Sequence, residues 1–120
     1  MILGIGMDVV EVPRFEEALE RHGERLRARF FTPAEMAYCD ERPDYAMHMA
    51  ARFAAKEACM KALGTGWRGG VQFTDIEVRK HPTGMPELVL TGVAKERAET
   101  LGVERILVSL SHESQMAMAV

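Results

Sequence analysis

The sequence is poor in cysteine and proline, and each shortage excludes a class of protein. Its 120 residues include two cysteines and five prolines. Two cysteines cannot build the disulfide framework of a small secreted domain, and Cys39 and Cys59 lack metal-ligand spacing. The few prolines and the 48% hydrophobic content exclude a disordered or fibrous chain. We expect one reduced, cytoplasmic, globular domain that spans residues 1–120.

Long apolar runs and an excess of positive charge are also absent. No window of the sequence approaches the roughly 20 apolar residues that cross a bilayer. The N-terminal stretch MILGIGMDVV has no basic leader and reaches Asp8 too early for a secretory signal. The formal net charge of −3 gives no general attraction to nucleic acid or anionic lipid. We therefore expect neither a membrane nor a nucleic acid as a partner.

The hydrophobic patterns predict a small α+β domain. Alternation predicts a strand over residues 2–10, with Gly4, Gly6 and Asp8 on one face. Helices are predicted at 13–23, 24–29, 33–42, 44–63 and 92–101. The helix at 33–42 begins with a capping box formed by Thr32 and Glu35. Further strands are predicted at 71–73, 76–79, 87–90, 105–112 and 115–120, and the last two are expected to form a hairpin.

The longest helix carries an acid and a base beside its apolar stripe. Glu57 lies at the edge of this stripe, and Lys61 follows one turn later. Ala50 and Ala54 flank the same edge, where small side chains permit the close approach of another backbone. If the glycine face of the first strand crosses there, Asp8 and Glu57 converge. The stripe itself consists of Met49, Phe53, Met60 and Leu63.

Converging carboxylates favour a hard cation. Mg²⁺ binds one or two carboxylates and completes its shell with water and substrate phosphates, and Mn²⁺ is an alternative. Lys61 adds a positive charge for a phosphate oxygen, and the backbone of Gly64 to Gly66 can approach a nucleotide. Asp8, Glu57 and Lys61 are therefore candidate catalytic residues of a phosphoryl-transfer site.

Each of these features also has a purely structural interpretation. Glu57 and Lys61 can form a solvated pair on the helix surface. Asp8 can cap or end the first strand, and the run from Gly64 to Gly66 can simply stop the helix. His112 can be an ordinary exposed histidine. The residues alone leave these alternatives open.

Three segments together carry a family resemblance. They are GIGMDVVE at 4–11, RFAAKEACMKALGTG at 52–66 and SLSH at 109–112. The middle segment is highly specific, the order and separation of all three fit, and the match extends from end to end. The turn Gly84-Met85-Pro86 fits as well. The chain thus resembles the holo-acyl-carrier-protein synthase family of phosphopantetheinyl transferases.

This resemblance implies a fold, an assembly and a reaction. The implied phosphopantetheinyl transferase fold packs one long helix against an antiparallel sheet, and three copies form a homotrimer that binds coenzyme A between subunits. The implied reaction transfers 4'-phosphopantetheine from coenzyme A to a serine of an apo acyl carrier protein, in fatty acid biosynthesis. The carrier serine attacks the phosphorus nearer pantetheine, adenosine 3',5'-bisphosphate leaves, and the serine proton passes to Glu57 or to bulk solvent.

The resemblance also assigns residues. Asp8 and Glu57 match the metal ligands, and Lys61 matches the phosphate-binding lysine. Arg52 and His112 match positions associated with coenzyme A, contributed across a subunit boundary. The full set of candidate coenzyme A contacts is Arg52, Lys61, Gly64, Gly66, Pro86 and His112.

An arginine face is the candidate dock for the acidic carrier protein. Arg14, Arg21 and Arg25 are spaced by seven and four residues, which places them on one side of a helix. The resemblance favours Arg14 most. The alternative is a solvated face whose charge is balanced by neighbouring acids, which are Glu17, Glu20 and Glu24.

The sequence departs from the family pattern in two places. Family members often carry several basic residues before the long helix, where this chain has Arg42, and Met116 stands where an aromatic residue is common.

The sequence also leaves two rival functions open. One rival function is a metal-dependent hydrolase of nucleotide diphosphates. The other is a non-enzymatic binding module for nucleotide or carrier protein, in which Asp8 and Glu57 are structural.

Overall fold

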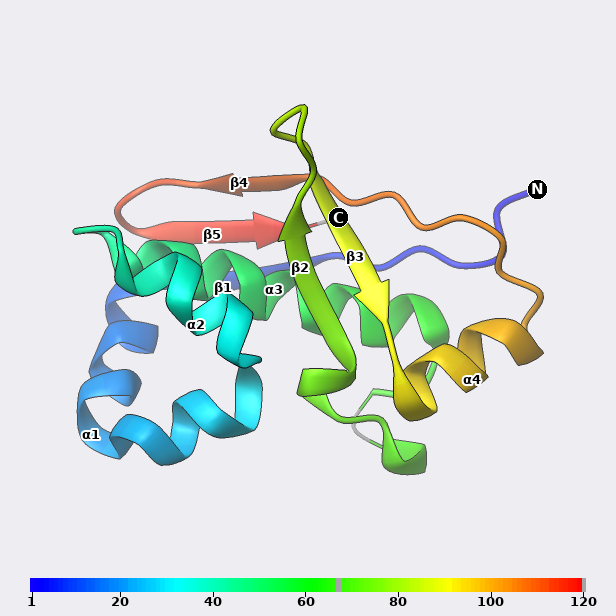
Figure 1. Cartoon of the computed structure of the whole chain (residues 1–120), viewed down its shortest axis with the longest axis horizontal. Helices are drawn as coiled ribbons and strands as arrows, with labels where there is room; N and C mark the ends of the chain where they lie inside the picture. The colour runs from blue at the N-terminus through cyan, green and yellow to red at the C-terminus, as the bar shows by residue number, and fades with distance from the viewer. Residues whose placement is uncertain (67, 120) are drawn as a thin grey trace.

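The computed structural model describes residues 1–66 and 68–119, and its longest helices are α1 and α3. The α+β class predicted from the sequence is confirmed (Figure 1). The elements, in chain order, are β1 (Asp8–Glu11), α1 (Val12–Phe30), α2 (Pro33–Asp40), α3 (Tyr45–Leu63), η1 (Arg68–Gly70), η2 (Phe73–Asp75), β2 (Ile76–Lys80), β3 (Pro86–Leu90), α4 (Gly92–Thr100), β4 (Leu110–His112) and β5 (Met116–Ala119).

Helix α3 is the element around which the others pack. Its sequence is rich in alanine and contains neither glycine nor proline, which favours an uninterrupted helix. The helix ends at Gly64, whose φ of 76° is left-handed and whose N–H donates to the Lys61 carbonyl at 3.1 Å. Alanines along α3 are buried, so neighbouring elements can approach its backbone closely.

Two small antiparallel sheets lie against α3 (Figure 1). The first has the order β1-β5-β4, and Met118 of β5 pairs with Val9 on one side and Ser111 on the other. The second is the β2–β3 hairpin, which crosses α3 near helices α1 and α2. The predicted hairpin of the last two strands is confirmed as β4 and β5.

Two predicted strands are shorter in the structure, and a third is absent. Strand β1 starts at Asp8 instead of residue 2, and β4 starts at Leu110 instead of residue 105. Both pair with the short strand β5, whose described end, Ala119, faces Asp8 and Leu110. Val120, the last residue of the predicted final strand, lies outside the described residues. The strand predicted at 71–73 is absent, because Phe73 begins the 3-10 helix η2.

The predicted helices are present, and the predicted interruption near residue 23 is a kink. Helix α1 continues through the break, where Gly23 has φ 53° and ψ −131°. The capping box before α2 is confirmed, since Thr32 Oγ1 accepts from the Glu35 N–H and Glu35 Oε1 accepts from the Thr32 N–H. None of the described helices combines the length and the hydropathy that a membrane span requires.

Candidate functional site

The N-terminal segment lies directly against the backbone of α3. A Cβ atom added at Gly6 would overlap the carbonyl oxygen of Ala58, and one added at Gly4 would overlap that of Ala62. The predicted glycine contact with the long helix is therefore confirmed, although it uses Ala58 and Ala62 in place of the predicted Ala50 and Ala54. Two residues of extended chain and four residues of helix each advance about 6–7 Å along the chain direction. The two-residue spacing of Gly4 and Gly6 therefore matches the four-residue spacing of Ala58 and Ala62.

This contact brings Asp8 to the helix edge that carries Glu57 and Lys61. The Lys61 ammonium group donates to Asp8 Oδ1 at 3.0 Å and to the Met7 carbonyl oxygen at 3.0 Å. Lys61 thus pairs with the strand acid, in contrast to the helix-surface pair with Glu57 that the spacing also allowed. The predicted convergence of Asp8, Glu57 and Lys61 is present.

The electrostatics of this cluster suit a bound cation. Burial raises the pKa of Glu57, the charge of Asp8 raises it further, and the charge of Lys61 lowers it. A carboxylate whose ionisation is disfavoured by burial and by a neighbouring acid is stabilised by a divalent cation with oxygen ligands. The described residues contain no cluster of three or more His, Cys, Asp or Glu side chains that could hold a metal. A pair of carboxylates is nonetheless a donor set that Mg²⁺ uses.

The segment after Lys61 is a tight loop that exposes backbone. Gly64 and Gly66 have positive φ values of 76° and 54°. Arg97 of α4 donates to the Leu63 carbonyl oxygen at 3.2 Å and holds the end of the helix. Gly64 is therefore a helix stop, and the loop lies next to the lysine in the chain.

A second cluster gathers positive charge around Tyr38 of α2. The guanidinium carbons of Arg42 and Arg52 lie 3.5 Å and 4.2 Å from the centroid of the Tyr38 ring. The Lys80 ammonium group, at the end of β2, lies 5.8 Å from the centroid and donates to the Tyr38 hydroxyl at 3.4 Å. Lys80 also pairs in register with Pro86 at the start of β3.

Two histidines adjoin this cluster. The His48 and His112 rings are 5.1 Å apart, and Arg52 donates to the His48 carbonyl oxygen at 3.3 Å. Asp44 lies 3.3 Å from His48, while burial lowers the pKa of this histidine. The sequence-predicted residues Arg52, His112 and Pro86 thus lie at or beside one basic cluster.

The two clusters face different directions within one chain. Arg52 and Glu57 are five residues apart on α3, which rotates their side chains by about 140° around the helix axis. A ligand that touches both must extend around the helix or meet a second copy of the chain.

The predicted arginine face is only partly supported. Arg14 and Arg21 are exposed on the first half of α1, where Arg21 donates to Glu17 at 3.1 Å. The kink at Gly23 interrupts the helical periodicity, so spacing no longer places Arg25 on the face of Arg14 and Arg21.

Sequence reasoning named Arg42, Arg52 and His112 of the basic cluster but missed Tyr38, His48 and Lys80. Tyr38 and Arg42 are four residues apart, as are His48 and Arg52, but only the second pair lies on one helix face, because α2 ends at Asp40. This repeated aromatic-to-cation spacing was a usable signal. The contribution of Lys80 depends on how β2 packs, and no local pattern indicates it.

Comparisons with known proteins agree over nearly the whole chain. The sequence profile of the 4'-phosphopantetheinyl transferase superfamily matches residues 4–119. A holo-[acyl-carrier-protein] synthase of Koribacter versatilis is 50% identical over 119 residues, covering 99% of this chain and 95% of the relative. The corresponding protein of Solibacter usitatus is 48% identical over the same shares.

Solved structures are similar as well. The crystal structure of holo-[acyl-carrier-protein] synthase from Neisseria meningitidis matches with a TM-score of 0.90 and 34% identity, covering 99% of this chain and 95% of that one. The Helicobacter pylori synthase in complex with coenzyme A matches with a TM-score of 0.83 and 32% identity, covering 96% and 95%.

Proposed function

The chain belongs to the 4'-phosphopantetheinyl transferase superfamily, and we propose that it is the transferase that converts apo acyl carrier protein to its holo form. The reaction moves 4'-phosphopantetheine from coenzyme A to a serine hydroxyl and releases adenosine 3',5'-bisphosphate, in support of fatty acid biosynthesis. The observation that carries this proposal is the convergence of Asp8, Glu57 and Lys61, in a chain similar to holo-[acyl-carrier-protein] synthases over 99% of its length. The buried free thiols of Cys39 and Cys59 fit a reducing, cytoplasmic setting.

Asp8 and Glu57 fit the metal that this family uses. In our proposal the two carboxylates hold Mg²⁺, with Mn²⁺ as an alternative, because hard cations prefer oxygen ligands. When bound, the ion supplies charge neutralisation at the diphosphate of coenzyme A. The raised pKa of Glu57 beside Asp8 supports this assignment, since two crowded carboxylates need a counter-charge.

The remaining steps belong to side chains of the chain itself. Lys61, whose side chain is 54% exposed, supplies a positive charge to the phosphoryl oxygens as negative charge develops on them. Glu57 has the raised pKa that suits an acceptor for the serine proton. Bulk water is the alternative acceptor, because a carboxylate that holds a metal is a weak base.

The basic cluster around Tyr38 suits the nucleotide end of coenzyme A. We assign Arg52 and His112 to its phosphate groups, with Arg42 as the basic residue that precedes α3. Pro86 lies beside Lys80 and provides an apolar surface near the same cluster. Gly64 and Gly66 bring exposed backbone close to Lys61 and the diphosphate.

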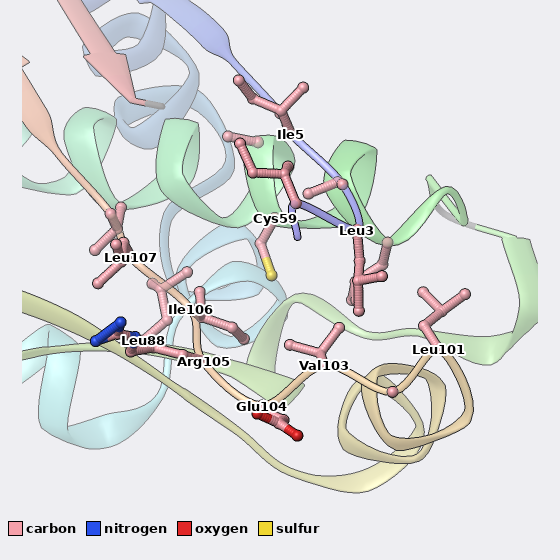
Figure 2. A pocket seen from close by; sticks show the side chains of 18 of the residues that line it. Leu3, Ile5, Cys59, Leu88, Leu101, Val103, Glu104, Arg105, Ile106 and Leu107 are labelled. Carbon is pink, nitrogen blue, oxygen red and sulfur yellow. The ribbon is translucent and has the colours of Figure 1, made fainter.

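We also propose a homotrimer with active sites between subunits. The outer face of the three-stranded sheet and the N-terminal segment expose a row of apolar side chains, which are Leu3, Ile5, Met7, Val9, Met116 and Met118. Beside this row, Leu3 and Ile5 border a groove of about 760 Å³ that residues 101–108 close on the far side (Figure 2). Exposed apolar area of this extent indicates an interface. A shared site also suits the different directions of the Arg52 and Glu57 side chains.

The acyl carrier protein is proposed to dock on the first half of α1. Arg14 and Arg21 are exposed there and offer positive charge to an acidic partner. Arg25 is the third member of this proposed surface and is also exposed, on the part of α1 that follows the kink. An Arg14→Glu variant should bind the carrier more weakly at low salt, and an unchanged affinity would remove this dock.

The test is a mass measurement on the carrier protein. Incubation with coenzyme A, Mg²⁺ and apo acyl carrier protein should add one phosphopantetheine group, and a chelator should prevent the addition. Glu57→Gln should abolish transfer, while the exposed control Glu96→Gln should retain it. Release of phosphopantetheine without any carrier would favour the hydrolase, and metal-independent binding without transfer would favour the binding module.

A further inference from the structure

Tyr38 is the centre of the basic cluster. Its ring contacts Arg42 from the turn that follows α2 and Arg52 from α3, and its hydroxyl contacts Lys80 from β2. Arg42 also donates to the Tyr38 carbonyl oxygen at 2.6 Å. One half-buried side chain therefore links cations from three separate elements.

The cluster has little compensating negative charge. Within the described part of the chain, Arg42, Arg52 and Lys80 form no ion pair with a carboxylate, and Asp44 pairs with His48 instead. Burial acts to raise the pKa of Tyr38, but its contact with Lys80 and the nearby charges of Arg42 and Arg52 outweigh this and leave the pKa lowered. The Tyr38 side chain therefore lies in strongly positive surroundings.

Arg52 carries a buried donor that suits an anion. Its exposed fraction is 6%, and its Nε atom has no hydrogen-bond partner among the residues that the structure describes. A buried donor without an acceptor is costly, and a phosphate oxygen is an acceptor that arginine binds well. The aromatic ring meanwhile offers Arg42 and Arg52 attraction through its π face, which holds like charges together before the anion arrives.

We propose that Tyr38 is a positioning residue that holds Arg42, Arg52 and Lys80 together for the 3'-phosphate of coenzyme A, and thereby sets the preference for coenzyme A over dephospho-coenzyme A. This inference rests on the proposed function, because it names what determines specificity within the same site. Tyr38 acts through the cations and does not touch the reacting phosphorus.

Leucine and methionine variants at position 38 test the proposal. Both remove the ring, while Tyr38→Phe keeps the ring and loses only the hydroxyl group that accepts from Lys80. The matched control is Tyr45→Leu, which removes a tyrosine ring that lies 5.6 Å from Arg27 outside the cluster. Circular dichroism identifies any variant that does not fold, and the second truncation then carries the test.

The expected result is a change in KM that depends on the 3'-phosphate. Loss of the ring should raise KM for coenzyme A about 10-fold, with kcat and the KM for dephospho-coenzyme A unchanged. The KM of Tyr38→Phe for coenzyme A should stay within about 2-fold of the parent value, and so should that of Tyr45→Leu. In calorimetry without carrier protein, the truncations should weaken the binding of adenosine 3',5'-bisphosphate and leave the binding of adenosine 5'-monophosphate unaffected.

Three outcomes would overturn the proposal. An unchanged preference in both truncations would show that the cations need no aromatic support. Equal weakening of bisphosphate and monophosphate binding would show that the effect of Tyr38 is not specific to the 3'-phosphate. A parent enzyme that transfers phosphopantetheine without any preference would remove the phosphate site, whereas a parent without transfer would refute the proposed function itself.

Discussion

At the residue scale, Lys56 shows how a single position can be decided by long-range packing. Its ammonium group is fully buried beside Glu35, at 2.6 Å, and also donates to the carbonyl oxygens of Phe73 and Ile76. Glu35 in turn accepts from the Val78 N–H at 2.9 Å. Burial lowers the pKa of Lys56, and the charge of Glu35 opposes that shift. The pair therefore connects α2, α3 and β2 one residue before the candidate metal ligand.

Breaking this pair should destabilise the protein strongly. Lys56→Met leaves the carboxylate of Glu35 buried without its counter-charge, so we expect the free energy of unfolding to fall by about 3–5 kcal/mol. The double variant Lys56→Met/Glu35→Gln removes both charges and should recover part of that loss. Urea unfolding followed by circular dichroism measures both. A single variant as stable as the parent would show that the pair is not needed for stability.

Gly6 decides how closely Asp8 approaches the helix. Because a Cβ at this position would overlap the Ala58 carbonyl oxygen, Gly6→Ala must move the N-terminal segment away from α3. We expect a loss of about 1–3 kcal/mol in stability and a fall in transfer activity greater than 10-fold, since Asp8 moves with the segment. Activity assays and urea unfolding check this. Ile2→Ala is the control, and normal activity in Gly6→Ala would exclude the contact as a positioning element.

Sequence reasoning found the acidic cluster but not the interior beside it. Asp8, Glu57 and Lys61 were predicted because glycine spacing, helix periodicity and a specific motif all indicated the same edge of α3. Lys56 belongs to the same motif and was not predicted as buried, because its partner Glu35 is 21 residues away. Glu35 was predicted only as a capping residue, which accounts for one of its two oxygens.

At the scale of elements, the kink of α1 at Gly23 means that a substitution there affects stability differently from one in an uninterrupted helix. Its φ of 53° with ψ of −131° is a conformation that only glycine adopts without strain, and an added Cβ would meet no described atom within 4 Å apart from the adjacent helix backbone. Gly23→Ala should therefore cost about 1–3 kcal/mol through backbone strain alone. Thermal or urea unfolding gives the sign of the change in the free energy of unfolding. In a continuous helix, the same substitution by alanine would instead stabilise the protein by about 1 kcal/mol.

The helices were easier to predict than the strands, for a physical reason. Helix ends carry local signals, such as Thr32 with Glu35 before α2 and Gly64 after α3. A strand exists only where a partner pairs with it, and among the described residues the alternating segments 2–7 and 105–109 have no pairing partner beside the short β5. Their alternation still has meaning, because one face of the first segment packs on α3 and the other is exposed.

At the scale of the whole molecule, the exposed apolar face is the feature that one chain leaves unexplained. Val9 and Met118 are paired across β1 and β5, and they are 43% and 42% exposed. Ile5, further along the same side, is 76% exposed. A second copy of the chain that covers this face would remove this area from water. This face is therefore the candidate interface of the proposed trimer.

A charge on this face should separate the subunits. Val9→Glu or Met118→Glu should convert a species of about three times the 13.4 kDa chain mass into monomers, as measured by analytical ultracentrifugation. Val93→Glu, on α4 away from the sheet, is the control. If the sites are shared, transfer activity should fall with the trimer. A fully trimeric Val9→Glu variant would show that this face is not the interface.

Mixing two inactive variants tests the shared site directly. Glu57→Gln removes the acidic cluster from one chain, and Arg52→Ala removes the central cation of the basic cluster from another. If each site combines Glu57 of one subunit with Arg52 of its neighbour, random mixed trimers restore roughly a quarter of the parent's sites. Co-refolded mixtures should therefore regain transfer activity that neither variant shows alone. A mixture as inactive as its components, although ultracentrifugation and mass spectrometry show mixed trimers, would place both clusters' contributions within single chains.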